Sequence, residues 1–276
     1  MGESALLVFS FFMQASIGIM LFMTLGKILH ADQEFKKAAY LAAGLSIIGV
    51  IASLAHLGKP LAALNSLLNV GSSWLSREVL FSGVFMGIAV LYALVQYLKV
   101  ENQGIKAALR WAGSGIGLIA VFSMAKLYST ASVPVWQGAN TFADFYGTTL
   151  AVGALLFLAL SFKELQGKDK KILGLIVLAA VVIQAAVAVP YGINLGLGGS
   201  AAHASAEILN GLSAAVGLKW LLVLGGAGIL LWPTLQQEAK SATGMIYLAG
   251  IALVCGQFIG RYIFYAAMVV TNIGLI

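Results

Sequence analysis

Eight apolar stretches dominate the sequence and limit what it can fold into. A helix needs about 20 predominantly apolar residues to cross roughly 30 Å of hydrocarbon. Stretches of about this length cover residues 5–29, 38–57, 78–98, 107–127, 143–162, 172–190, 212–232 and 244–270. The chain is 61% hydrophobic and only 9% charged, with a mean hydropathy of +0.97, which excludes an ordinary soluble domain. The sequence therefore predicts a polytopic membrane protein.

The expected fold is an all-α bundle of eight transmembrane helices, forming a single integral membrane domain over residues 1–276. The alternating pattern of a membrane β-barrel is missing, and open strands would leave backbone groups unsatisfied in lipid. The first stretch carries Glu3 and no basic segment before it, so a retained helix is expected rather than a cleaved signal. The single cysteine, Cys255, gives neither a disulfide framework nor the ligands of an iron–sulfur cluster.

The basic residues predict the orientation of the bundle, because loops on the inner side carry an excess of Lys and Arg. Of the 16 Lys and Arg residues, 11 fall at the first, third, fifth and seventh connections: Lys27, Lys36, Lys37, Lys99, Lys106, Arg110, Lys163, Lys168, Lys170, Lys171 and Lys240. Both termini are thus expected on the outer, periplasmic side of a bacterial inner membrane. This bias accounts for most of the net charge of +6, so no nucleic-acid partner is expected.

The connections predicted on the outer side differ in kind from the inner ones. Residues 57–76, 128–142 and 191–211 are long, weakly charged and contain Trp, Tyr and Gly. Apolar outer segments indicate a surface that lies on the membrane or under another protein. Residues 60–76, 128–142 and 191–211 are therefore expected to form a docking face.

Ionisable residues of otherwise apolar helices converge on this outer side. Arg261 lies 17 residues into the last stretch, which is about 25 Å along a helix. The others fall at the outer ends of the second, third and fourth helices, and the set is His56, Lys59, Arg77, Glu78, Lys126 and Arg261. Charge inside a membrane is costly, so such a cluster predicts a functional site.

Each of these residues also has a purely structural explanation. Glu78 suits the first turn of a helix, where the helix dipole favours an acid, and His56 suits the last turn of the preceding one. Lys59 suits a side chain that reaches the membrane interface. Arg261 suits an ion pair with Glu78 or Glu207.

Three further side chains near the predicted site have the same two interpretations. Gln14, inside the first stretch, suits either the site or a hydrogen bond between helices. Trp74 and Trp136 suit ligand stacking or anchoring at the membrane interface.

The chemistry of the cluster fits a quinone. An imidazole and a carboxyl can bond the two ring oxygens and take up protons as electrons leave. The sequence has no Ser–His–Asp arrangement at a usable depth, no phosphate-binding glycine loop and no His pair at zinc-binding spacing. With His30 expected on the inner side, b-type haem is not expected, although topology alone leaves the pair His56 and His203 open.

A secondary transporter or channel is the alternative from another class. It predicts paired discontinuous helices near the bilayer centre. The charges lie instead at one face, and Pro190 and Pro233 are expected near helix ends.

Four segments carry a resemblance to a known family. "HLGKPLAALNSLLNVGSSWLSREVLFSG" resembles the signature of the membrane anchor subunit of dimethyl sulfoxide reductase, the DmsC type, and "FMQASIG", "KLYSTASVPVW" and "IGRYIFY" agree with it. The resemblance implies a subunit that oxidises menaquinol and passes electrons to an iron–sulfur subunit with four [4Fe–4S] clusters. A catalytic subunit with a molybdenum bis-pterin cofactor then receives them. Related anchors serve sulfite, tetrathionate, selenate and polysulfide enzymes, some of them reducing quinone.

The resemblance also assigns site residues. His56 and Glu78 match the quinol-site residues of the family and are the expected catalytic pair, and Gln14 and Arg261 match other recurring positions. The expected quinol-binding set is His56, Glu78, Arg261, Gln14, Lys59, Arg77 and Trp74, with no metal ligand in this protein.

The "HLGKP" turn is expected to place His56 opposite the start of the third helix. Gly58 permits a left-handed helix cap and Pro60 cannot continue the helix. His56 would then lie in the last turn, close to Glu78.

Overall fold

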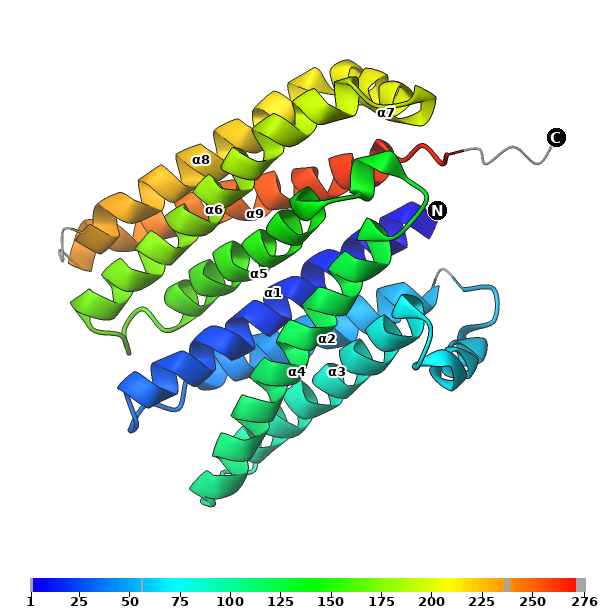
Figure 1. The fold of residues 1–276 in the computed structure, drawn as a ribbon. Helices are drawn as coiled ribbons and strands as arrows, with labels where there is room; N and C mark the ends of the chain where they lie inside the picture. Colours follow the sequence, from blue (N-terminus) through cyan, green and yellow to red (C-terminus); the bar gives the residue numbers. More distant parts are fainter. Residues whose placement is uncertain (1, 56, 236–238, 272–276) are drawn as a thin grey trace.

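Eight long helices run side by side in the computed structural model, which describes residues 2–55, 57–235 and 239–271 (Figure 1). Each is long and apolar enough to cross a membrane. They are α1 (Gly2–Leu29), α2 (Lys36–Ala55), α3 (Trp74–Tyr97), α4 (Gln103–Ser129), α5 (Ala139–Leu160), α6 (Gly167–Gly196), α8 (Ser213–Leu235) and α9 (Ala239–Ala266). The predicted all-α bundle with eight spans is therefore confirmed.

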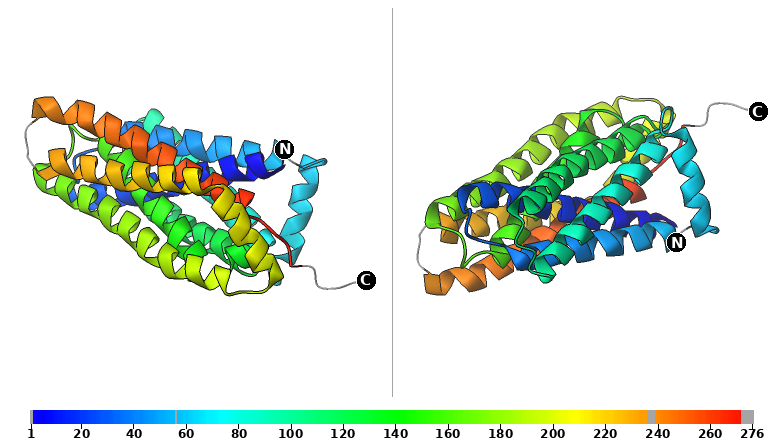
Figure 2. Two further views of the ribbon diagram at one scale, coloured as in Figure 1. Left: turned by 90° about the horizontal axis from the view of Figure 1, so that it is seen from above. Right: turned by 90° about the horizontal axis from the view of Figure 1, so that it is seen from below.

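The three remaining elements all lie at one end of the bundle, which we call the η1/α7 end (Figure 1). They are the 3-10 helices η1 (Pro60–Asn69) and η2 (Pro134–Trp136) and the short helix α7 (Ser200–Gly211). In Figure 2, η1 lies crosswise to the spanning helices and covers part of this end. Leu68 of η1 is 85% exposed, so the apolar character predicted for this face is present in the structure.

Two connections are more ordered than the sequence indicates. Helix α6 continues through Pro190 to Gly196, six residues past its expected end at residue 190. Proline removes one backbone hydrogen bond but is tolerated in membrane helices when neighbours compensate. The segment that follows forms α7, where the sequence indicates only an apolar loop.

The turn after α2 differs from the one expected. Gly58 does not adopt the left-handed conformation, and α2 ends at Ala55 with a tight bond from Leu57 N to Leu54 O of 3.1 Å. Lys59 is extended and Pro60 begins η1, where its fixed φ and missing N–H cost nothing. The expectation of a left-handed cap at Gly58 was therefore wrong. His56 lies outside the described residues.

Helix α1 is the centre of the packing. It contacts α2, α4, α5 and α9, and 78% of its most apolar window is buried, compared with 33% for α2 and 22% for α8. Its closest approach is to α5, where Gly18 meets Gly153: a Cβ added at Gly18 would lie 2.7 Å from the Gly153 Cα and would clash with the Thr149 carbonyl oxygen. Small residues permit this contact between backbones, as is usual where membrane helices cross closely.

Basic residues at the opposite end form ion pairs that join the connections there. Glu34 contacts Lys27 Nζ at 3.5 Å and Lys106 Nζ at 3.2 Å. Burial raises the pKa of the Glu34 carboxyl, but the hydrogen bonds from Gln96 and Lys106 and the two lysine charges outweigh it, so the pKa lies below the usual value. His30 Nε2 lies 2.6 Å from Asp169 Oδ2, which links the end of α1 to the start of α6.

The crossing of α1 and α5 gives a first prediction. Gly153→Leu should destabilise the protein by about 1–3 kcal/mol or more, because the new side chain meets the Gly18 backbone, which cannot move aside. The measurement is thermal unfolding of the detergent-purified protein. Gly83→Leu is the control, since a Cβ there meets nothing within 4 Å. Equal melting temperatures for the two variants would contradict the importance of this contact.

Candidate functional site

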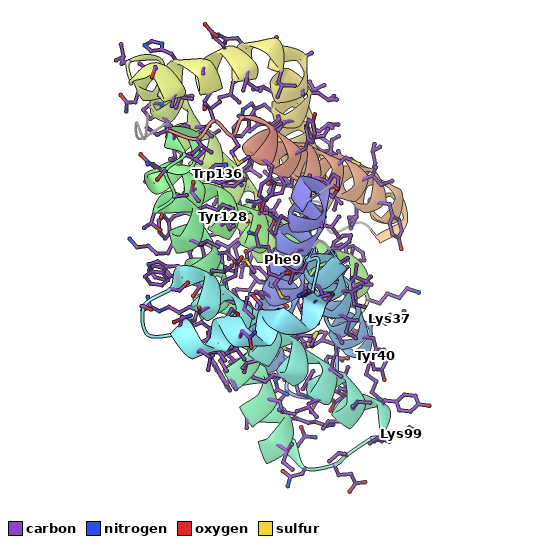
Figure 3. The ribbon with its side chains drawn as sticks, turned by 90° about the vertical axis from the view of Figure 1, so that its right-hand side faces the viewer. Phe9, Lys37, Tyr40, Lys99, Tyr128 and Trp136 are labelled. Carbon is purple, nitrogen blue, oxygen red and sulfur yellow. The ribbon has the colours of Figure 1, made fainter. Side chains whose placement is uncertain are left out.

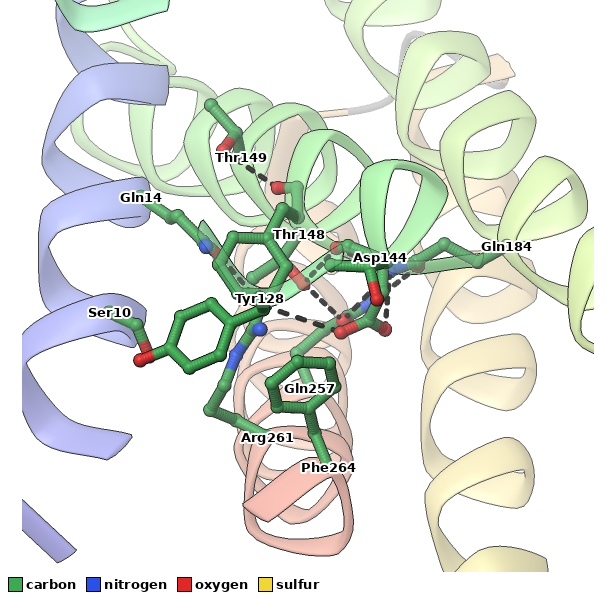
Figure 4. Close-up of polar contacts among 12 residues, drawn as sticks. Ser10, Gln14, Tyr128, Asp144, Thr148, Thr149, Gln184, Gln257, Arg261 and Phe264 are labelled. Carbon is green, nitrogen blue, oxygen red and sulfur yellow. Dashed lines mark hydrogen bonds and ion pairs between the residues drawn. The ribbon is translucent and has the colours of Figure 1, made fainter. Parts of the chain in front are cut away.

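Arg261 of α9 is the centre of a buried polar cluster (Figure 4). The residue is 1% exposed, and its Nη2 donates a 2.8 Å hydrogen bond to Gln14 Oε1 of α1. The same Nη2 lies 3.5 Å from Asp144 Oδ2 of α5, and the guanidinium carbon lies 3.9 Å from the centre of the Phe145 ring. One cation thus contacts two neighbouring helices by a hydrogen bond, an ion pair and a cation–π interaction.

The ion partner of Arg261 is Asp144, which the sequence did not single out. The structural alternatives considered for Arg261 were Glu78 and Glu207, and Glu207 is exposed. Asp144 is the only acid in the predicted span 143–162, a signal that could have identified it. Its other oxygen lies 3.7 Å from Lys219 Nζ of α8 and accepts a 3.4 Å hydrogen bond from Gln184 Nε2.

Amide side chains extend the cluster between α5, α6 and α9. Gln257 Nε2 donates to Gln184 Oε1 at 2.8 Å, and Thr148 Oγ1 donates to Gln257 Oε1 at 2.9 Å. Gln184 also donates to the Asp144 carbonyl at 3.1 Å. These bonds satisfy polar groups that would be costly to bury alone.

Two tyrosines lie on the other side of Arg261. Tyr128 of α4 and Tyr265 of α9 have hydroxyl oxygens 2.9 Å apart, and Tyr265 donates to Ser10 Oγ at 3.3 Å. Trp136 packs edge-on against Tyr128 at 5.0 Å and donates from Nε1 to the Phe264 carbonyl at 2.7 Å (Figure 3). Trp136 is therefore a buried part of this group of aromatic rings.

Glu78 of α3 is a buried acid near this tyrosine pair. The residue is 4% exposed, and its Oε1 has no hydrogen-bond partner among the described residues. The carboxyl is close enough to interact electrostatically with the hydroxyls of both Tyr128 and Tyr265. Helix α3 begins at Trp74 with Ser73 as its N-cap, so Glu78 lies beyond the first turn, and the helix dipole does not explain its position.

The other predicted binding residues lie apart from this cluster. Arg77 donates to the carbonyls of Val70 at 2.9 Å and Gly71 at 2.6 Å and stacks 4.2 Å over the Trp74 ring. Both side chains therefore fix the turn between η1 and α3. Lys59 is exposed at the η1/α7 end. Of the predicted set, the structure joins Gln14 and Arg261 by a hydrogen bond, and Glu78 is within electrostatic reach of the tyrosines beside them.

A cavity of about 500 Å³ borders the cluster on the side away from Glu78. It lies between α5, α6, α7, α8 and α9, and Asp144, Gln184 and Lys219 line it together with Tyr191, Trp220 and Phe264. Asp144 thus belongs to both the buried cluster and the cavity wall.

The fold and this cluster define a helical membrane protein with a buried polar cluster around Arg261 (Figure 4). The protein belongs to the DMSO reductase anchor subunit (DmsC) family, whose model matches residues 1–267. As a member of this family it is a membrane anchor of a DMSO reductase-type complex in a bacterial membrane.

Curated relatives agree with this family. The sequence is 30% identical to the C subunit of the anaerobic dimethyl sulfoxide reductase of Escherichia coli over 221 residues, which cover 79% of this protein and 76% of the relative. It is 31% identical to the anaerobic dimethyl sulfoxide reductase subunit YnfH of the same organism over 221 residues, with the same shares covered. It is 28% identical to the corresponding C subunit of Haemophilus influenzae over 271 residues, covering 95% of this protein and 94% of the relative.

The ion pair gives a second prediction. Asp144→Leu should destabilise the protein by about 3–5 kcal/mol, because it leaves the Arg261 guanidinium buried without a carboxylate. The double variant Asp144→Leu with Arg261→Met should regain most of this loss, since it removes both charges. Thermal unfolding of the purified protein measures both. No recovery in the double variant would show that the two residues act independently.

Proposed function

We propose that this subunit oxidises menaquinol at a site formed by His56 and Glu78, as the anchor of a DMSO reductase-type complex in the bacterial inner membrane. The observation that carries the proposal is Glu78: a carboxyl buried in a membrane helix, with an oxygen that has no hydrogen-bond partner in the part of the chain that the structure describes. Buried carboxyls are normally paired, because leaving one unpaired costs at least about 1–3 kcal/mol. A ligand hydroxyl would supply the missing hydrogen bond.

The chemistry needs two groups that bind the quinol hydroxyls and accept protons. His56 directly follows α2 in the sequence, and α2 packs against α3. His56 accepts a hydrogen bond from one hydroxyl through a ring nitrogen, and Glu78 takes the proton of a hydroxyl group. Gln14 and Arg261, joined by a 2.8 Å hydrogen bond between α1 and α9, are the further polar residues of this proposed site.

The two electrons of each quinol leave through partner subunits in this proposal. An iron–sulfur subunit with four [4Fe–4S] clusters receives them and passes them to a subunit with a molybdenum bis-pterin cofactor. The alternative within this class is an anchor whose partner enzyme acts on sulfite, tetrathionate, selenate or polysulfide. Such an anchor can also run in reverse and reduce quinone, and it uses the same site.

We assign the docking of the iron–sulfur subunit to the η1/α7 end, taken as the outer face. Both the exposed leucine of η1 and the site residue Glu78 lie toward this end, which shortens the distance for electron transfer. The lysines at the opposite end fit the inner side of the membrane.

Continuous helices speak against a transporter. The eight spanning helices are unbroken over their described residues, and Pro190 lies near the end of α6. Paired discontinuous helices at the bilayer centre would be expected for that class.

The site gives a third prediction, tested in the purified complex. His56→Gln and Glu78→Gln each keep a hydrogen-bonding group but remove a proton acceptor, so menaquinol-driven turnover should fall at least about 100-fold. Activity with an artificial dye that reduces the soluble subunits directly should be retained. The control is Glu207→Gln, an exposed acid on α7. Equal losses with quinol and dye would mean that these residues only support the structure.

The docking face gives a fourth prediction. Cross-linkers in the assembled complex should join the iron–sulfur subunit to Lys59 at the η1/α7 end. Cross-links confined to Lys99 and Lys168 would place the partner at the opposite end and reverse the proposed orientation.

A further inference from the structure

Four buried polar atoms of Glu78, Gln14 and Arg261 have no hydrogen-bond partner among the described residues. Among the buried atoms of the described residues, Glu78 Oε1, Gln14 Nε2, and Arg261 Nε and Nη1 make no hydrogen bond within the protein. They belong to α3, α1 and α9, and the side chains of Gln14 and Arg261 are joined directly at 2.8 Å. Buried donors and acceptors of this kind are normally satisfied by ordered water.

The hydroxyls of Tyr128 and Tyr265 are within electrostatic reach of both Glu78 and Arg261. The two hydroxyls share a hydrogen bond of 2.9 Å. A hydroxyl both donates and accepts, so a bonded pair can continue a chain of water molecules. No hydrogen bond within the described part of the protein joins the Glu78 carboxyl to either hydroxyl, so a proton passing between them needs a bridging molecule.

Asp144 connects this region to the cavity. One of its oxygens faces Arg261 at 3.5 Å, and the other faces Lys219 at 3.7 Å. The cavity of about 500 Å³ has room for many water molecules and has further polar groups on its wall, among them Gln184 and Lys219. Asp144 is therefore the group that joins the Arg261 guanidinium to the cavity wall.

We propose that a chain of internal water molecules links Glu78, past Tyr128, Tyr265 and the Gln14–Arg261 pair, to Asp144 and its cavity, and that quinol protons leave the site along it. This inference rests on the proposed quinol oxidation. Each quinol releases two protons and two electrons; the electrons pass to the iron–sulfur partner, and the protons pass from Glu78 to the cavity.

The first test removes one hydroxyl from the chain of water molecules and side chains. Tyr128→Phe keeps the ring contacts with Trp136, Phe145 and Phe264. In the assembled complex, menaquinol-driven turnover should fall at least about tenfold and its ratio in H2O and D2O should rise, because proton transfer becomes limiting. Tyr92→Phe is the matched control: Tyr92 is 1% exposed and bonds Gln96 at 2.8 Å near the opposite end. Its turnover and isotope ratio should stay at the wild-type values.

The second test fills the cavity without changing any polar group. Gly217 of α8 lines the cavity, and a Cβ there meets nothing within 4 Å, so Gly217→Phe should displace water from the path. It should slow menaquinol-driven turnover like Tyr128→Phe. Gly225→Phe is the control on the same helix, at an exposed position with the same free space.

Three readouts separate the outcomes. Dye-driven activity reports assembly, and binding of a quinol analogue to the complex reports an intact site. Slow quinol turnover in a variant that keeps dye-driven activity and analogue binding supports the proposed proton path. Wild-type turnover and a wild-type isotope ratio in Gly217→Phe overturn the proposal, even if Tyr128→Phe fails to assemble. Failure of the wild-type complex to bind the analogue or oxidise menaquinol would instead refute the proposed function.

Discussion

A guanidinium sealed inside an apolar bundle constrains the rest of this structure. Arg261 is always charged, and its burial must be compensated by groups that come from other helices. Gln14 of α1 and Asp144 of α5 meet it from two sides, and the Phe145 ring covers it. These contacts fix how α1, α5 and α9 lie along one another. Because Arg261 pairs with Asp144, Glu78 forms no ion pair with a described residue. Glu78 is therefore the acid best suited to react.

Neighbouring residues near the start of α3 have separate tasks because of helix geometry. Successive residues of an α-helix point about 100° apart, at 3.6 residues per turn. Arg77 therefore turns toward the carbonyls of the preceding turn, while Glu78 turns into the bundle. A charged run in the sequence is thus split into a residue that shapes the η1/α7 end and a residue that faces the buried cluster.

Hydropathy predicted the all-α bundle of eight spans because the membrane demands long apolar helices, whatever their neighbours. Depth along each span also brought Gln14, Glu78 and Arg261 into one candidate site, and the structure joins Gln14 and Arg261 of that set by a hydrogen bond. The partner of Arg261 could not be predicted, because it depends on which helices pack side by side. For the same reason α7 and the conformation of Gly58 were missed: both depend on contacts at the end of the bundle and not on apolar length. The assignments to His56, and the quinol role of the whole set, remain predictions.

The central position of α1 has a consequence for how the protein is made. Helix α1 is synthesised before α5 and α9, which cover it at Gly18 and Gln14 and begin at Ala139 and Ala239. Until α9 emerges, the amide of Gln14 faces lipid or the insertion machinery, where polar groups are poorly tolerated. Helix α1 therefore stays in the membrane without its polar partner until α9 inserts. Insertion of α9 is thus the step that completes both the bundle and its polar interior, and a protein truncated before Arg261 would have an open, unfinished core.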